Sequence, residues 1–213
     1  MNDTWARRAP WTGIAAVVCV LAAIILGGET PDFDASRADI VSHYDDQAAT
    51  STAAALIALT ALFFVFFASS LRARLRAAES ASTVLLVGGA IFAVGLALFA
   101  GIEFTLSDLV NSDKAIDPGT LQALNALDSD GFFPSQVGLA IFYFSTAFAI
   151  LASGGLPRWW GWVTLVLAVL SVLGPLGFLA FVLTLPWTLV TAILLMQGGG
   201  EPATSVPETG PAP

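Results

Sequence analysis

The stretch SHYDD, residues 42–46, contains the single histidine of the chain. If this segment is helical, Asp39, His43 and Asp46 stand at positions i, i+4 and i+7 and share one face. One imidazole and two carboxylates are ligands that a divalent cation can use. The two carboxylates can also raise the pKa of His43 towards the pH outside the cell, which would make it a proton sensor. A third interpretation is the solvated face of an amphipathic helix.

Glu103 is a second candidate, because it lies directly after a long run of uncharged residues. An ionisable side chain at membrane depth is a functional hypothesis in its own right. If the apolar helix extends one turn further inward, Glu103 lies inside the bundle, opposite Gln136. Otherwise Glu103 marks the level of the lipid headgroups.

Asp128 and Asp130 come just before another apolar run. An aspartate in this position is typical of a helix N-cap. The two residues could instead join His43, Asp46 and Glu103 around an outward-facing acidic vestibule. Such a vestibule would suit a cationic ligand.

The elements that must position these residues are transmembrane helices. The chain has 213 residues, of which 56% are hydrophobic and only 11% are charged. Soluble domains carry roughly a quarter charged residues. About 20 apolar residues cross a bilayer as a helix, and several uncharged runs reach that length. The predicted spans are 11–28, 50–71, 80–102, 134–154, 160–174 and 177–197, joined on the outside by loops 28–50 and 103–133.

The basic residues predict the orientation, because cytoplasmic loops are rich in Lys and Arg. Six of the eight basic residues fall on one side of the six predicted spans, and only Arg37 and Lys114 fall on the other. The prediction is an all-α, six-span bundle of the plasma (inner) membrane with both termini cytoplasmic. The first span follows a basic segment but lacks a good cleavage site, so we expect it to be retained. The Gly/Pro-rich tail 198–213 is expected to be disordered.

The outer loops also carry helical patterns. Asp117-Pro118 predicts the start of a short outer helix, since aspartate caps helices and proline suits the first helical position. Ile40, Val41 and Tyr44 share an apolar face. We expect their segment to run directly into the second span as one long helix.

Small residues recur every fourth position in several spans, for example Gly89, Ala93, Ala97 and Gly101. Such stripes let helices pack closely in lipid, either within one chain or between the subunits of a homo-oligomer. Tryptophans collect near the predicted cytoplasmic boundary, as in an interfacial aromatic belt. They are Trp5, Trp11, Trp159, Trp160 and Trp162.

Three stretches of this chain carry a resemblance. They are IVSHYDDQAATSTAAALIALTALFFVFFASSLRARLR, LDSDGFFPSQVGLAIFYFSTAFAIL and GGLPRWWGWVTLVLAVL. Together they cover a little over a third of the chain, and the order of features resembles a widespread bacterial family of six-span membrane proteins that carries only a domain-of-unknown-function label. The resemblance implies a fold and a topology, and it implies no activity.

Three functions stay open at this point. The first is a non-enzymatic membrane protein that binds a ligand or a protein partner through its acidic outer loops. The second is a small transporter or channel for a cation or an apolar solute, and the third is a membrane enzyme that acts on lipid. No motif for a cofactor is evident, and the net charge of −8 argues against nucleic acid, so membrane lipid is the expected partner.

Overall fold

The fold is described from a computed structural model, which covers residues 8–112, 116–130, 133–173 and 176–197. The regular elements within these ranges are helices, and the ranges contain no strand. The helices are α2 (Trp11–Gly27), α3 (Arg37–Tyr44), α4 (Gln47–Arg74), α5 (Glu79–Val110), α6 (Pro118–Asp130), α7 (Phe133–Ser153), α8 (Arg158–Ser171) and α9 (Leu176–Gln197). The all-helical class predicted from the sequence is confirmed. The predicted tail, 198–213, lies outside the described residues.

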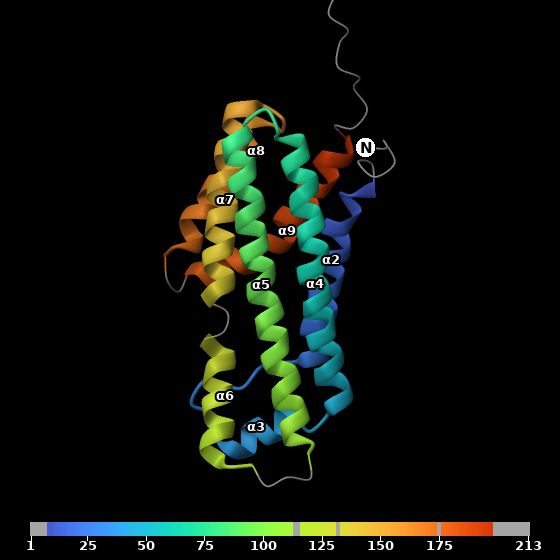
Figure 1. Cartoon of the computed structure of the whole chain (residues 1–213), viewed down its shortest axis with the longest axis vertical. Helices are drawn as coiled ribbons and strands as arrows, with labels where there is room; N and C mark the ends of the chain where they lie inside the picture. The colour runs from blue at the N-terminus through green and yellow to red at the C-terminus, as the bar shows by residue number, and fades with distance from the viewer. Residues whose placement is uncertain (1–7, 113–115, 131–132, 174–175, 198–213) are drawn as a thin grey trace, which may run out of the picture.

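The long helices form an elongated bundle (Figure 1). The most extensive packing joins α5 to α7 and α4, with α2 against α4 and α8 against α7. The short helices α3 and α6 lie together at one end, beside the C-terminal half of α5 (Figure 1). We call α3, α6 and this half of α5 the cap. The turns between α4 and α5 and between α7 and α8 lie at the opposite end.

Four stretches are long and apolar enough to cross a membrane. They are Gln47–Arg74, Glu79–Val110, Pro118–Ser153 and Leu176–Gln197, and α2 is a shorter apolar helix. The chain therefore has the helices of a multi-pass membrane protein. Helix α8 has 14 residues, which corresponds to about 21 Å, less than the ~30 Å of a hydrocarbon core.

Glycines explain how closely α5 and α7 approach. A Cβ on Gly138 would lie 2.2 Å from the backbone nitrogen of Phe92, and one on Gly88 would lie 2.5 Å from that of Phe142. Contacts this short leave no room for a side chain, so glycine is required at both positions. Gly101, in the stripe predicted from the sequence, has no atom within 4 Å of the added Cβ. The stripe therefore contributes to this interface only in part.

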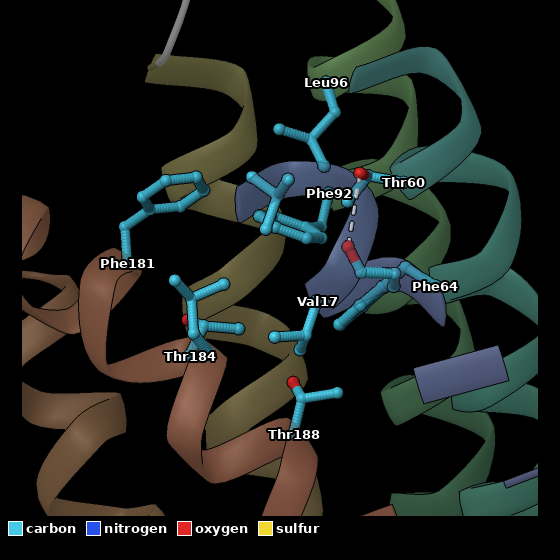
Figure 2. Close-up of a pocket in the computed structure, with 11 residues that line it drawn as sticks. Val17, Thr60, Phe64, Phe92, Leu96, Phe181, Thr184 and Thr188 are labelled. Carbon is cyan, nitrogen blue, oxygen red and sulfur yellow. Dashed lines mark hydrogen bonds between the residues drawn. The ribbon is translucent and has the colours of Figure 1, made fainter. Parts of the chain in front are cut away.

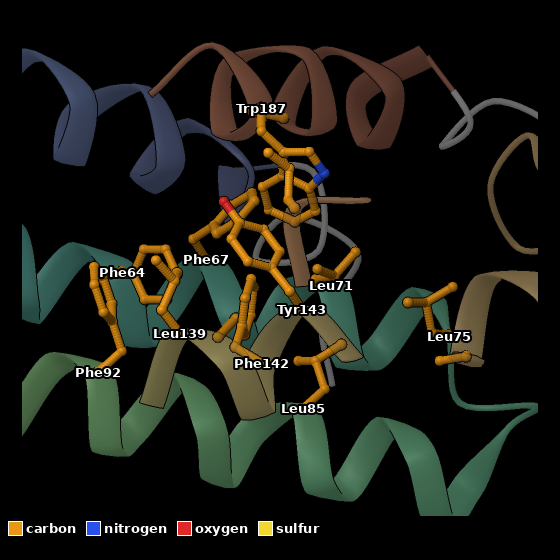
Figure 3. Close-up of a cluster of buried hydrophobic side chains, with 14 of the residues drawn as sticks. Phe64, Phe67, Leu71, Leu75, Leu85, Phe92, Leu139, Phe142, Tyr143 and Trp187 are labelled. Carbon is orange, nitrogen blue, oxygen red and sulfur yellow. The ribbon is translucent and has the colours of Figure 1, made fainter. Parts of the chain in front are cut away.

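Aromatic side chains fill the bundle core. Figure 3 shows Phe67, Phe142, Tyr143 and Trp187 coming together from α4, α7 and α9. The indole of Trp187 meets the ring of Tyr143 edge to face, with centroids 5.1 Å apart. Aromatic pairs in this geometry stabilise a core beyond the area that they bury.

Trp160 belongs to the core and not to the predicted belt. It is 7% exposed, and its Nε1 donates to Thr191 Oγ1 at 2.9 Å. Trp11, Trp159 and Trp162 are each more than half exposed, as interfacial tryptophans should be. The prediction was wrong for Trp160 because its helix face turns towards α9. Trp5 lies outside the described residues.

The predicted continuous helix through the first outer loop and second span is also wrong. Helix α3 ends at Tyr44, and α4 begins at Gln47. Asp46 has φ −81° and ψ 81°, and its carboxylate accepts a hydrogen bond from the backbone nitrogen of Ala49 at 3.1 Å. Aspartate favours such caps over helix interiors, so Asp46 starts a new helix.

Candidate functional site

The cap has a hydrophobic core of its own. Ile40 and Tyr44 from α3 pack with Leu106 from α5 and Leu121 from α6, and all four are buried. The helical spacing of Ile40, Val41 and Tyr44 predicted this face of α3, and Leu121 begins the apolar face of α6. The packing turns the ring of Tyr44 away from solvent and into the space between α5 and α6.

Hydrogen bonds from amide side chains fix the cap in place. Asn125 on α6 donates to the carbonyl of Asp32 at 2.8 Å, and Gln122 donates to that of Phe33 at 2.9 Å. Asn111, which follows α5, donates to the carbonyl of Tyr44 at 2.7 Å. These bonds tie both ends of the segment that contains α3 to the neighbouring helices.

The side chains of α4 and α5 join where the cap meets the bundle. The hydroxyls of Thr50 and Ser107 are 2.8 Å apart and buried, and Gln47 donates to Asp108 at 3.2 Å. Helix α5 is thereby held on both sides, by α4 and by the cap. The position of a side chain on the face of α5 towards α6 is therefore fixed.

Glu103 lies on that face of α5, and it forms a buried acidic cluster with Asp128 and Tyr44. Glu103 is 7% exposed, Asp128 is 4% exposed, and Tyr44 is fully buried. The Tyr44 hydroxyl and Asp128 Oδ1 are buried and have no hydrogen-bond partner. In the described part of the chain neither carboxyl group forms an ion pair.

The pKa of Tyr44 indicates that both carboxyl groups lie near its phenol. Burial raises the pKa of the Tyr44 phenol well above its ordinary value, and the negative charges of Asp128 and Glu103 raise it further. The influence of both carboxylates on the phenol requires that they lie near it, although the three residues come from three helices.

The cluster has a chemical preference that follows from its composition. Burying a carboxylate without a hydrogen bond or a counter-charge costs several kcal/mol. Two carboxyl groups and a phenol offer only oxygen ligands, which suit hard cations. A cation bound beside these groups would therefore offset the cost of burying them.

The predicted set of Asp39, His43 and Asp46 is not brought together in this way. Both aspartates are exposed, and each has a local structural partner: Asp39 Oδ2 accepts from Ser36 Oγ at 2.7 Å, while Asp46 caps α4. Among the described residues, no group of three His, Cys, Asp or Glu side chains could hold a metal ion. The set depended on one continuous helix through residue 46, and the helix breaks before that residue.

The pKa of His43 shifts in the opposite direction from the one that the proton-sensor hypothesis requires. The imidazole is partly buried and meets the ring of Tyr44 edge to face, with centroids 4.7 Å apart. Burial lowers the pKa of His43 below its ordinary value. The carboxylates that were expected to raise the pKa make no ion pair with the imidazole.

Gln136, another predicted site residue, lies apart from the cluster. Gln136 lies against α9, where a Cβ added to Gly177 would be 2.6 Å from Gln136 Oε1. That oxygen is buried and has no hydrogen-bond partner. Glu103 is inside the fold as the first alternative predicted, and the acidic group coupled to it is Asp128, which the vestibule hypothesis also placed near Glu103. The side chain of Asp130 falls outside the described part of the structure.

A small cavity in the bundle core is separate from the acidic cluster. Figure 2 shows Val17, Thr60, Phe92, Thr184 and Thr188 around it. Its volume is about 30 Å³, and α2, α4, α5 and α9 supply the lining side chains, none of them charged. A cavity of this size and lining holds one water molecule or stays empty.

Tyr44 is the site residue that sequence reasoning missed. The sequence placed Tyr44 with Ile40 on the apolar face of α3, and the packing of both residues bears this out. A buried tyrosine hydroxyl ordinarily has a hydrogen-bond partner. The signal was therefore a polar atom on an apolar face, next to a loop rich in acids.

Comparison with protein families, with curated proteins and with solved structures gives no match for this chain. The class of protein thus rests on the fold, which is an all-helical bundle with four stretches able to cross a membrane.

Proposed function

We propose that this chain is a non-enzymatic, multi-pass membrane protein that binds a small inorganic cation from the extracytoplasmic side, at the cluster of Tyr44, Glu103 and Asp128. The observation that carries the proposal is the pair of buried, unpartnered oxygens, the Tyr44 hydroxyl and Asp128 Oδ1. Burial without a partner is unfavourable for both groups. A cation between them removes that cost.

The membrane topology belongs to the same proposal. We place six crossings in the inner membrane, with both termini and the arginine-rich turns in the cytoplasm and the cap outside. Helices α2 and α8 are short for a crossing. The bilayer would therefore have to become thinner around these two helices.

The length of α5 supports an outward-facing cluster. The helix has 32 residues, or about 48 Å, which exceeds the ~30 Å hydrocarbon core. A core that begins near Glu79 ends about twenty residues later, close to Phe99. Glu103 then lies just beyond the hydrocarbon, where a cation can arrive from water.

A titration of the purified protein in nanodiscs tests the proposal. Calcium, magnesium, sodium and potassium are added in turn, and binding is followed by calorimetry and native mass spectrometry. One of these cations should bind with one site per chain. Asp128→Asn and Glu103→Gln should each weaken that binding at least about tenfold, because each removes a charged ligand of the cation.

Asp45→Asn is the matched control, since Asp45 is exposed on the same outer side. This variant should bind as the wild type does. Failure of all four cations to bind the wild type would refute the proposal, and so would equal losses in Asp45→Asn and Asp128→Asn.

A transporter is the second candidate, and a specific observation favours it. Ser135 and Gln136, at the start of α7, carry buried oxygens without partners. Gly95 of α5 lies against Ser135, and Glu103 is two helical turns further along α5, about 12 Å away. A cation released from the cluster would meet these polar groups next on its way inward. Flux into proteoliposomes that Gln136→Leu abolishes would support transport.

Among the residues that the structure describes, no particular group of side chains supports a lipid-acting enzyme. The homo-oligomer and the protein partner expected from the sequence stay predictions. Native mass spectrometry from the first experiment also reports the number of chains in the assembly.

A further inference from the structure

The end of the molecule opposite the cap carries a group of exposed arginines. Arg72 and Arg74 lie in the last turn of α4, Arg76 lies in the turn before α5, and Arg158 begins α8. All four side chains are exposed, and in the described part of the chain none forms an ion pair. The nearest acid in the sequence, Glu79, is also exposed and unpaired.

Contacts between two turns bring these arginines together. Arg74 Nε donates to the carbonyl of Gly155 at 3.0 Å. Leu75 and Leu156 are buried in the bundle core beside this bond. The turn after α4 and the turn before α8 therefore meet, which places Arg158 close to Arg74 and at the same end of the bundle as Arg72 and Arg76.

The bond made by Arg74 leaves its two terminal nitrogens available. Arginine presents paired donors that match two oxygens of a phosphate group, which lysine cannot do. The exposed indoles of Trp159 and Trp162 follow directly on α8. Exposed tryptophans of this kind lie at the level of lipid headgroups, so these arginines stand where headgroup phosphates are found.

We propose that Arg72, Arg74, Arg76 and Arg158 form a binding surface for the phosphate headgroups of anionic phospholipids. Positive charge, paired donors and position at the headgroup level all suit this occupant. The surface lies at the far end of the bundle from the acidic cluster. The proposal therefore does not depend on cation binding.

Native mass spectrometry of the full chain tests the proposal. The protein is titrated with phosphatidylglycerol and, separately, with phosphatidylcholine of the same acyl chains. Phosphatidylglycerol should give more tightly bound adducts. Arg72→Gln should weaken them about fivefold and Arg72→Gln with Arg76→Gln about thirtyfold, since each charge near an anionic surface contributes a similar factor.

Arg37→Gln is the matched control, because Arg37 is an exposed arginine in the cap. It should leave the phosphatidylglycerol adducts unchanged, and Arg72→Lys should retain part of the binding. Thermal unfolding in nanodiscs, which does not depend on cation binding, serves as the folding check for every variant. Equal binding of the two lipids to the wild type would overturn the proposal. Equal losses in Arg37→Gln and Arg72→Gln, or displacement of the lipid by millimolar inorganic phosphate, would overturn it too.

Discussion

The indoles of Trp160 and Trp187 stack with centroids 6.2 Å apart and nearly parallel planes, and each donates to a threonine on the other's helix. Trp160 of α8 bonds Thr191 of α9, and Trp187 of α9 bonds Thr164 of α8, both at 2.9 Å. In each helix the threonine follows its tryptophan by four residues, so both lie on one face. This reciprocal pair is the main polar link between α8 and α9.

Thr164→Val should destabilise the protein by about 1 kcal/mol. The substitution preserves shape but leaves the buried Nε1 of Trp187 without an acceptor, and hydrogen bonds between membrane helices contribute on this scale. Reversible unfolding in mixed micelles, followed by tryptophan fluorescence, measures the change. Thr52→Val is the control, because Thr52 is exposed and bonds only its own helix. Equal free energies of unfolding for the two variants would show that the pair contributes nothing.

Gly138→Ala should destabilise the bundle strongly, by about 3 kcal/mol or more, since the added methyl group meets the backbone of Phe92. Gly101→Ala places the same methyl group in open space on α5. The latter should be neutral or gain up to about 1 kcal/mol from helix propensity. The same unfolding assay compares them. A Gly138→Ala variant as stable as Gly101→Ala would mean that α5 and α7 do not approach as described.

The two fully buried tyrosines should respond in opposite ways to loss of the hydroxyl. Tyr143 donates to Thr184 at 2.8 Å, whereas the Tyr44 hydroxyl has no partner. Without added cation, Tyr143→Phe should cost about 1 kcal/mol, and Tyr44→Phe should be neutral or stabilising. Thermal unfolding in nanodiscs checks both. With cation present, Tyr44→Phe should lose part of the stabilisation that the wild type gains. A large loss of stability in Tyr44→Phe without cation would contradict the prediction, because it would mean that the Tyr44 hydroxyl forms a hydrogen bond in the folded protein.

His43 should make the folded state less stable in mild acid. Its pKa in the folded protein is below the ordinary value of about 6.5, so between these two values the unfolded chain binds more protons. The free energy of unfolding should therefore rise with pH across this window. His43→Gln should lack the rise, and the difference between the two proteins isolates it from other titrating groups. An NMR titration that places the imidazole pKa at or above 6.5 would contradict the prediction and restore the raised pKa inferred from the sequence.

Composition and charge-free runs were sufficient to predict the helical class, because long apolar helices leave little choice of secondary structure in lipid. The turn that starts α6 followed from Asp117-Pro118, where capping chemistry is local. Asp117 indeed accepts a hydrogen bond from the backbone nitrogen of Thr120 at 3.0 Å. Local signals of this kind can be read from single residues.

The candidate site could be predicted only in part, because its partners meet through tertiary packing. Glu103 and Asp128 were grouped from the sequence as one of two alternatives, but the choice between these alternatives depends on the register of α5 against α6 and α7. Gly88, Gly95 and Gly138 set that register, and periodicity alone did not single them out. The break after Tyr44 was missed because an apolar pattern on either side of a polar Asp-Asp pair suits one helix as well as two.

The presence of two separate hydrophobic cores has a consequence for cooperativity. The core of the cap, around Tyr44 and Leu121, shares no buried side chain with the aromatic core of the bundle. Regions with independent cores open independently, and the smaller one opens first. The cap can therefore come loose while the bundle stays folded in the bilayer. A cation held between α3, α5 and α6 would stabilise the cap against this opening, so occupancy of the site would be visible as slower hydrogen exchange throughout the cap.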